Sequence, residues 1–221
     1  MNKVLNQLPL GLQRWVRKSL RSYYRPYKIK SWQRQGRPIP PVHDVKQWYI
    51  ETFQKKINAV NLVETGTYHG AMIEAQIELF NDIYSIEWDK GLYEKAQVRF
   101  APDPHVHLFN GDSGEVLSKV LPSLNGTTIF WLDGHYSGSG TAGDESYCPI
   151  MKELDVLLPA NRQDFFIIVD DAREFNGTNG YPTIEEIKSS ILRHGNKFNC
   201  KVQHDLIFIF PKSSSIDAIT L

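Results

Sequence analysis

The sequence lacks the features that mark several large classes of protein. It has no uncharged apolar run of 18 residues, so no helix that spans a membrane is expected. It has only two cysteines, Cys148 and Cys200, which are too few for a disulfide framework and lack the spacing of a metal site. The first residues show no short apolar core of the kind found in secretory signals. We therefore expect free thiols and a cytoplasmic location.

Acidic residues are absent from the first 37 positions, which carry ten basic residues; the first acid is Asp44. The whole chain has 25 basic and 25 acidic residues, so the remainder carries 15 basic and 25 acidic ones. Such an asymmetry is typical of a basic arm joined to an acidic domain. We expect residues 1–43 to form a basic helical arm with a proline-rich linker, and residues 44–221 to form the domain.

The arm is expected to be helical from Pro9, because proline fits the first turn of a helix. Its basic residues recur every three or four positions and share one face: Arg14, Arg17, Lys18, Arg21 and Arg25. This face could contact an anionic membrane or a polyanionic partner, or the helix could pack on the domain or on a second subunit of a homo-oligomer. Nucleic acid is disfavoured, because the acidic domain would repel phosphate. Four prolines predict a linker over residues 26–43.

From residue 44 onward, apolar runs typical of strands alternate with helical patterns. Strands are expected over residues 61–64, 83–87, 106–109, 128–133, 165–170, 198–204 and 206–210. Helices are expected over residues 45–56 with Asp44 as cap, 71–80, 90–100, from Ser113 as cap, 149–158, and 183–193 with Thr183 as cap. This alternation predicts an α/β fold: a Rossmann-like, seven-stranded, mostly parallel sheet covered on both faces, with a C-terminal antiparallel hairpin.

Acidic residues stand at or just beyond the carboxyl ends of the first five predicted strands: Glu64, Glu87, Asp112, Asp133 and Asp170. In an open α/β sheet, ligands bind at this edge, near the point where the strand order reverses. A single acid here is commonly a helix cap, but five in succession are harder to explain as caps. The placement predicts a binding site at the carboxyl edge of the sheet.

The turn after the first strand reads Glu64-Thr-Gly-Thr-Tyr-His-Gly70, where a side chain at Gly66 would obstruct a close ligand. It lacks the three-glycine spacing of dinucleotide-binding turns. Glu87, about 20 residues on, is placed to accept hydrogen bonds from ribose hydroxyls. Asp112 could accept from an adenine amino group or serve as a turn residue. Trp88 could flank adenine, although packing is the simpler interpretation.

Three segments resemble the first three motifs of class I S-adenosylmethionine-dependent methyltransferases: the turn Glu64 to Gly70, Ser85-Ile-Glu-Trp-Asp89, and Asn110-Gly-Asp112. Over residues 60–211 the sequence is similar to metal-dependent O-methyltransferases of the catechol and macrolide-sugar types. The resemblance implies S-adenosylmethionine as cofactor, contacted by Glu64, Gly66, Thr67, Tyr68, Gly70, Glu87, Trp88, Asp112, Ser113 and Asp133. It also implies Mg²⁺, held by Asp133, Asp170 and Asp171.

The implied metal site is chemically reasonable, because Mg²⁺ prefers oxygen ligands and three close carboxylates would otherwise repel one another. In the alternative, Asp133 caps a loop and Asp171 points away. His135 follows Asp133 by two positions and could take a proton from a bound hydroxyl, or form a hydrogen bond within the loop. Catechol-type enzymes use a lysine nearby, and none occurs between Asp133 and Cys148. Asp133 therefore stays an alternative base.

The expected function is methyl transfer from S-adenosylmethionine to a hydroxyl of a small molecule, sugar or glycan, assisted by Mg²⁺. The polar loops over residues 136–147 and 173–181 would act as lids, or are simply surface loops. One alternative is another nucleotide-cofactor enzyme, an oxidoreductase or hydroxylase, which the missing third glycine disfavours. Another is a non-catalytic binding module. The arm over residues 1–37 would place the protein at the periphery of an anionic membrane.

Overall fold

Seven strands form one sheet in the order β3-β2-β1-β4-β5-β7-β6 in the computed structural model, which describes residues 8–134 and 148–214. The first five strands are parallel, and β7 runs antiparallel to both β5 and β6. This confirms the predicted α/β fold with its C-terminal hairpin. The strands are β1 (Asn61–Thr65), β2 (Asp82–Glu87), β3 (Val106–Asn110), β4 (Thr128–Leu132), β5 (Phe165–Val169), β6 (Phe198–Gln203) and β7 (Leu206–Pro211).

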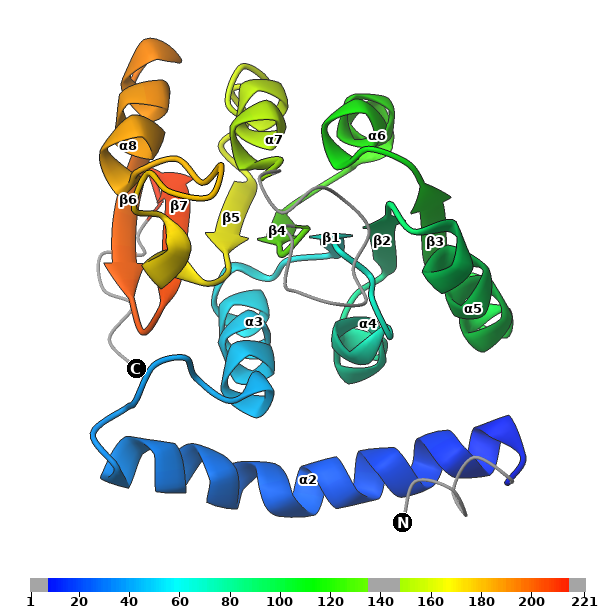
Figure 1. Cartoon of the computed structure of the whole chain (residues 1–221). Coiled ribbons are helices and arrows are strands. Elements are labelled where there is room, and N and C mark those ends of the chain that lie inside the picture. Colours follow the sequence, from blue (N-terminus) through cyan, green and yellow to red (C-terminus); the bar gives the residue numbers. More distant parts are fainter. Residues whose placement is uncertain (1–7, 135–147, 215–221) are drawn as a thin grey trace.

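Helices cover both faces of the sheet (Figure 1). One face carries α3 (His43–Ile57), α4 (Ala71–Gln76) and α5 (Lys90–Phe100), and the other carries α6 (Ser113–Val120), α7 (Ile150–Leu157) and α8 (Ile184–Arg193). Each face has its own apolar core. Every residue of β1, β4 and β5 is buried, as the continuous apolar runs of the central strands predict.

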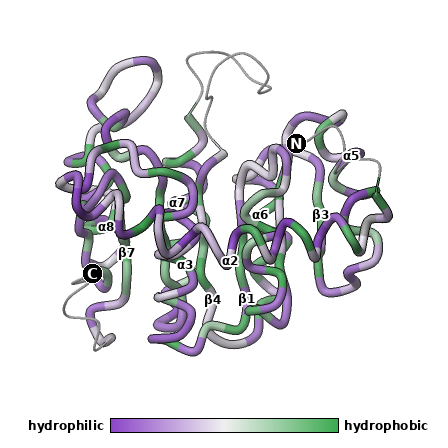
Figure 2. Tube along the Cα trace, turned by 90° about the horizontal axis from the view of Figure 1, so that it is seen from below, coloured by the Kyte–Doolittle hydropathy of each residue, from purple (hydrophilic) through white to green (hydrophobic). Residues whose placement is uncertain are grey.

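The long helix α2 (Leu10–Arg34) forms an additional layer outside α3 and α4. Seen from below, it runs across the molecule, roughly crosswise to the strands (Figure 2). The arm therefore packs on the domain, which was one of the two interpretations of the sequence. None of the helices in the described residues is both long and apolar enough to cross a membrane.

The linker expected over residues 26–43 is wrong in its first half, because α2 continues through Pro26 to Arg34. A proline inside a helix costs about 3 kcal/mol. Contacts on both sides of Pro26 offset this cost: Arg25 pairs with Glu51 of α3, and the buried Trp32 donates its indole N–H to the Pro38 carbonyl at 2.9 Å. Proline chemistry alone predicted a helix end that tertiary packing overrides.

Two of the expected helix caps differ in the structure. Asp112, not Ser113, caps α6, and its carboxylate accepts from the Glu115 N–H at 3.0 Å. Asp44 lies inside the first turn of α3, which has no side-chain cap, and pairs instead with Lys28 of α2. The third expectation is confirmed, since Thr183 forms a complete capping box at the start of α8.

Candidate active site

The acids after the strands lie at the carboxyl edge of the sheet. In register, Glu64 pairs with Ser85 on one side and with Trp131 on the other, so the ends of β2, β1 and β4 are level. The chain moves outward in one direction through β1, β2 and β3, and in the other through β4 and β5. The reversal therefore lies between β1 and β4, where open α/β sheets bind ligands.

Gly66 lies at this reversal point between the ends of β1 and β4, which we call the crevice. It has φ of 85°, and a Cβ built on it would lie 2.4 Å from the Asp133 carbonyl oxygen. The glycine is therefore required by the close approach of the backbone that follows β4. At the end of the same turn, a Cβ on Gly70 would meet the Phe100 ring at 2.5 Å. Because both glycines lack a side chain, the turn can pack closely against the end of β4 and against α5.

A chain of short hydrogen bonds lies beneath the turn. The Thr67 and Ser85 hydroxyls are 2.6 Å apart, and Ser85 Oγ donates to Glu64 Oε2 at 2.6 Å. Glu64 is almost completely buried. Burial raises its pKa to about 8, the Ser85 hydrogen bond opposes this, and the nearby Asp133 and Glu87 add to it. Glu64 therefore holds a proton near neutral pH and acts as a neutral hydrogen-bonding group.

Glu87 fixes the backbone around the same crevice. Its carboxylate accepts from the Tyr68 N–H at 2.7 Å and from the Asp89 N–H at 2.9 Å. Tyr68 adopts a left-handed φ of 46°, which is uncommon for a residue with a side chain and is typical of functional turns. The Tyr68 and Trp88 side chains are both about half exposed beside this turn.

Asp112 and Ser113 follow β3 at the outer end of the crevice. Besides capping α6, the Asp112 carboxylate pairs with Lys152 of α7 at 2.7 Å. In the structure, Asp112 therefore acts as a residue of the turn before α6, which is one of the two interpretations of the sequence. Ser113 is buried as the first residue of α6.

Three carboxylates converge on the other side of the crevice. One oxygen each from Asp133, Asp170 and Asp171 lies within 4.8 Å of the others, so the structure brings together the three residues predicted as metal ligands. Asp171 has a left-handed φ of 53°, and its N–H donates to Asp170 Oδ1 at 2.8 Å. Asp171 therefore does not point away from the cluster.

Lys46 of α3 enters this cluster. Its Nζ lies 2.5 Å from Asp170 Oδ2 and 3.2 Å from Asp171 Oδ1, and its side chain is 13% exposed. Burial by itself lowers the Lys46 pKa, but the neighbouring carboxylates outweigh burial and raise it. Lys46 therefore stays an ammonium ion. Sequence reasoning missed this residue, because nothing in its local pattern connects it with carboxylates some 120 positions away.

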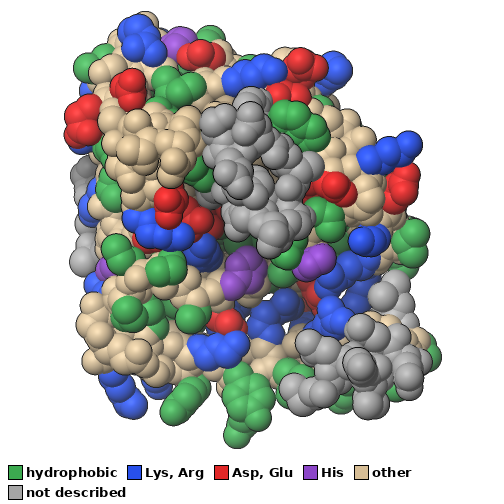
Figure 3. Space-filling view, viewed as in Figure 1, with side chains coloured by type: hydrophobic (Ala, Val, Ile, Leu, Met, Phe, Trp, Pro, Cys, Tyr) green, Lys and Arg blue, Asp and Glu red, His purple; other side chains and the backbone are tan. Residues whose placement is uncertain are grey.

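A second cation flanks the cluster. The Arg173 guanidinium donates to Asp171 Oδ1 at 2.9 Å and also pairs with Asp205 and Glu174. Nearby, Tyr181 packs edge-on against Phe175, and burial raises the pKa of its phenol. Figure 3 shows acidic and basic side chains next to each other on this face of the molecule, beside the residues drawn in grey. His135 and the loop over residues 136–147 lie outside the described residues.

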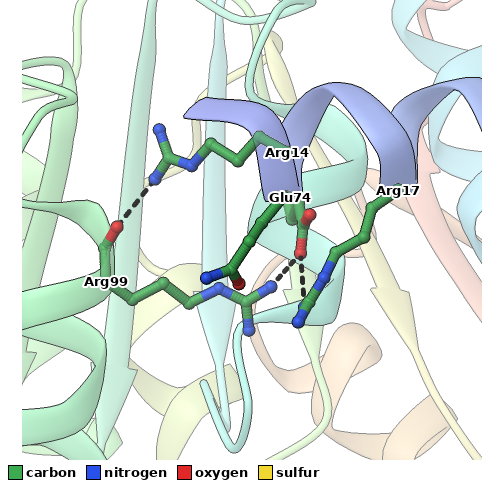
Figure 4. Close-up of a pocket in the computed structure, with 5 residues that line it drawn as sticks. Arg14, Arg17, Glu74 and Arg99 are labelled. Atoms are coloured by element: carbon green, nitrogen blue, oxygen red, sulfur yellow. Dashed lines mark hydrogen bonds and ion pairs between the residues drawn. The ribbon is translucent and has the colours of Figure 1, made fainter. Parts of the chain in front are cut away.

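The basic face of α2 points toward the domain. Arg14 pairs with Asp103, Lys18 with Glu78 and Arg17 with Glu74. Figure 4 shows Glu74 between the guanidinium groups of Arg17 and Arg99, in a cavity of about 140 Å³. Arg99 also donates to the His69 carbonyl, so this network reaches the turn that precedes α4.

No family model matches the sequence, and no curated protein matches it. Solved methyltransferases share the fold. A Podospora anserina methyltransferase bound to S-adenosylhomocysteine aligns with a TM-score of 0.55 and 14% identity, over 84% of this chain and 87% of that one. A Bacillus cereus O-methyltransferase, also bound to S-adenosylhomocysteine, aligns with a TM-score of 0.54 and 12% identity, over 85% of this chain and 90% of that one.

The methyltransferase of the mycinamycin pathway, solved with Mg²⁺, S-adenosylhomocysteine and mycinamycin VI, gives a TM-score of 0.52 and 14% identity. It aligns over 80% of this chain and 52% of that one. The expected Rossmann-like methyltransferase fold is thereby confirmed for this chain.

Proposed function

We propose that this protein is an S-adenosylmethionine-dependent O-methyltransferase that acts on a hydroxyl of a small molecule, sugar or glycan. The observation that carries the proposal is the crevice between β1 and β4, where Gly66 meets Asp133 and where acidic side chains stand at or just beyond the ends of the first five strands. An adenosyl group, with its hydroxyl and amino donors, suits an edge that is rich in hydrogen-bond acceptors. Solved proteins of the same fold carry the demethylated product.

The residues of the crevice fit this cofactor. The turn has no side chain at Gly66, so its backbone lies directly against Asp133 at the end of β4. Glu87 is held in place by two backbone N–H groups and retains lone pairs for ribose hydroxyls. Trp88 flanks the base, and Asp112 with Ser113 borders its amino edge. Thr67 and Glu64 support the turn from beneath.

When bound, S-adenosylmethionine supplies a methyl group that is already activated by its positive sulfur. The chain must then orient the acceptor oxygen and remove its proton. Asp133 stands at the end of β4, beside Gly66, where it borders both the cofactor turn and the acidic cluster. We propose that Asp133 or His135 accepts the acceptor proton.

Mg²⁺ assistance is part of the proposal. The donors of Asp133, Asp170 and Asp171 are hard oxygens within reach of one ion, and their chemistry fits Mg²⁺. A bound Mg²⁺ would lower the pKa of a coordinated hydroxyl. The mycinamycin methyltransferase, of similar fold, was solved with Mg²⁺.

Calorimetric titration with S-adenosylmethionine, S-adenosylhomocysteine and NAD tests the proposal. We expect both adenosyl sulfur compounds to bind at one site per chain and NAD not to bind. Binding of NAD alone would favour an oxidoreductase on this scaffold, and binding of none of the three would favour a non-catalytic module. A panel of hydroxylated acceptors with labelled methyl donor then tests methyl transfer directly.

We further propose that the arm over residues 1–37 places the enzyme on an anionic, cytoplasmic membrane surface. The basic face of α2 pairs with the domain, so the contact falls to the opposite face, where Trp15, Tyr23 and Tyr27 are between 65% and 77% exposed. Lys30 and Arg34 are exposed on the same side by helical periodicity. Tryptophan, tyrosine and basic residues favour the interface of an anionic bilayer. Figure 3 shows apolar side chains projecting from this lower edge.

Flotation with phosphatidylserine-containing vesicles tests the membrane contact. We expect the full chain to float with the vesicles and the W15S/Y23S/Y27S variant to stay in the dense fraction. Val98→Ser, which changes an equally exposed apolar residue on α5, is the matched control and should float like the wild type. Equal flotation of the triple variant would contradict this contact.

A further inference from the structure

The acidic cluster already contains a cation that belongs to the chain. Lys46 contacts two of the three carboxylates, at 2.5 Å from Asp170 and 3.2 Å from Asp171. The Asp170 side chain is 2% exposed, so its partner is held away from water. Burying a charged pair in this way is costly unless the partners are well matched. The ammonium is therefore an integral part of the site in the absence of an ion.

Three oxygens of Asp170 and Asp171 already accept hydrogen bonds from the chain. Asp170 Oδ1 accepts the Asp171 N–H, and Asp170 Oδ2 faces the ammonium. Asp171 Oδ1 accepts from both Lys46 and Arg173. A divalent ion bound to these oxygens at roughly 2.1 Å would lie within a few ångströms of the ammonium and be repelled by it. The ion and the ammonium therefore compete for these oxygens.

We propose that Lys46 is an internal competitor for the divalent cation: its ammonium occupies the cation position of the Asp133, Asp170 and Asp171 cluster, and an ion binds there only when Lys46 withdraws. Lys46 extends from α3, and its long unbranched side chain can leave the cluster without movement of the sheet. The chain thus keeps the three carboxylates together and compensates part of their charge before an ion arrives. The inference depends on the proposed function only where it assigns a use to the bound ion; the competition between Lys46 and the ion does not depend on it.

Binding of Mn²⁺, followed by electron paramagnetic resonance on the full chain without cofactor, tests the proposal. Lys46→Met removes the competitor, and we expect it to bind Mn²⁺ more tightly than the wild type by about 10- to 100-fold, because a like charge a few ångströms from the ion is gone. Lys46→Arg keeps the charge and should bind as weakly as the wild type. Asp170→Asn in the Lys46→Met background should remove the gain.

Thermal unfolding gives a second measurement. Lys46→Met leaves buried carboxylates without their partner, so its melting temperature should fall and should be restored by Mn²⁺, whereas the wild type should respond little. Lys46→Gln, which can still donate a hydrogen bond to Asp170, serves if the methionine variant does not fold.

Equal Mn²⁺ affinities of the wild type and the Lys46→Met and Lys46→Gln variants, or no Mn²⁺ binding in either variant, would overturn the proposal. Neither measurement uses S-adenosylmethionine. Failure of the donor to bind would therefore refute the proposed methyl transfer while leaving the competition between Lys46 and the ion intact.

Discussion

The two charged regions of the molecule, the contact between α2 and the domain and the acidic edge of the sheet, balance their charges in different ways. Under α2, basic and acidic side chains are similar in number and range from the largely buried Glu74 to Lys18 and Glu78, which are each more than half exposed. At the edge, the ammonium of Lys46 is buried among three carboxylates. Exposed pairs contribute little stability, and buried unequal charge is costly. The acidic excess at the edge therefore supports the binding site that we propose there.

The largest expected effect at the acidic edge is the change of the unfolding free energy with pH that Glu64 causes. Its pKa is raised to about 8 in the folded state, from an ordinary value of 4.5. The folded chain therefore holds this proton more tightly than the unfolded chain. The stability that it contributes is complete below about pH 4.5 and is lost as pH rises through 8, by roughly 5 kcal/mol at most.

Chemical unfolding of the wild type and of Glu64→Gln from pH 5 to pH 9 measures this effect. The glutamine keeps a neutral, hydrogen-bonding side chain and does not titrate, so the difference in unfolding free energy between the two proteins should change in its favour as pH rises. A difference that stays constant over this range would show that Glu64 is already ionised at pH 5.

The next effect compares one buried and one exposed acid. Asp170→Ala leaves Lys46 without its closest partner and should lower the free energy of unfolding by about 3–5 kcal/mol. Glu78→Ala, which removes the exposed partner of Lys18, should cost less than about 1 kcal/mol. Urea unfolding at pH 7 measures both, and equal losses would remove the distinction between the two regions.

Much of this arrangement follows from the sequence. The alternation of strands and helices placed Glu64, Glu87, Asp133 and Asp170 at one edge, because parallel strands joined by helices share their carboxyl ends. Lys46 could not be found in this way, since its role arises from the packing of α3 over the end of β5. The helix beyond Pro26 was missed for the same reason: the contacts that stabilise it come from α3 and the following loop.

A smaller effect is expected at the centre of the α2 contact. Glu74 accepts from Arg99 and lies 3.7 Å from Arg17, with a side chain that is largely buried. Glu74→Gln leaves these guanidinium groups without a carboxylate and should cost about 1–3 kcal/mol in unfolding free energy. Burial and the neighbouring Arg17 and Arg14 already lower the Arg99 pKa to about 10, which shows how closely these cations lie. A cost no larger than that of Glu78→Gln would contradict the importance of this network.

The smallest effect is the coupling between Lys18 and Glu78. A double-mutant cycle to alanine should give about 0.2–1 kcal/mol at low salt and less at 1 M salt, because both groups are exposed. A larger coupling that is insensitive to salt would show that the α2 contact is as strongly coupled as the acidic edge.

The most direct test of the central claim is the calorimetric affinity for S-adenosylmethionine of the wild type, Glu87→Gln and the control Glu94→Gln. Glu87 lies at the end of β2 beside the Gly66 turn, whereas Glu94 lies on the exposed side of α5. The account predicts one site per chain, weakened about 10- to 100-fold by Glu87→Gln, the loss expected for hydrogen bonds to a charged group, and unchanged by Glu94→Gln. No binding by the wild type, or equal affinity in the Glu87 variant, would contradict it.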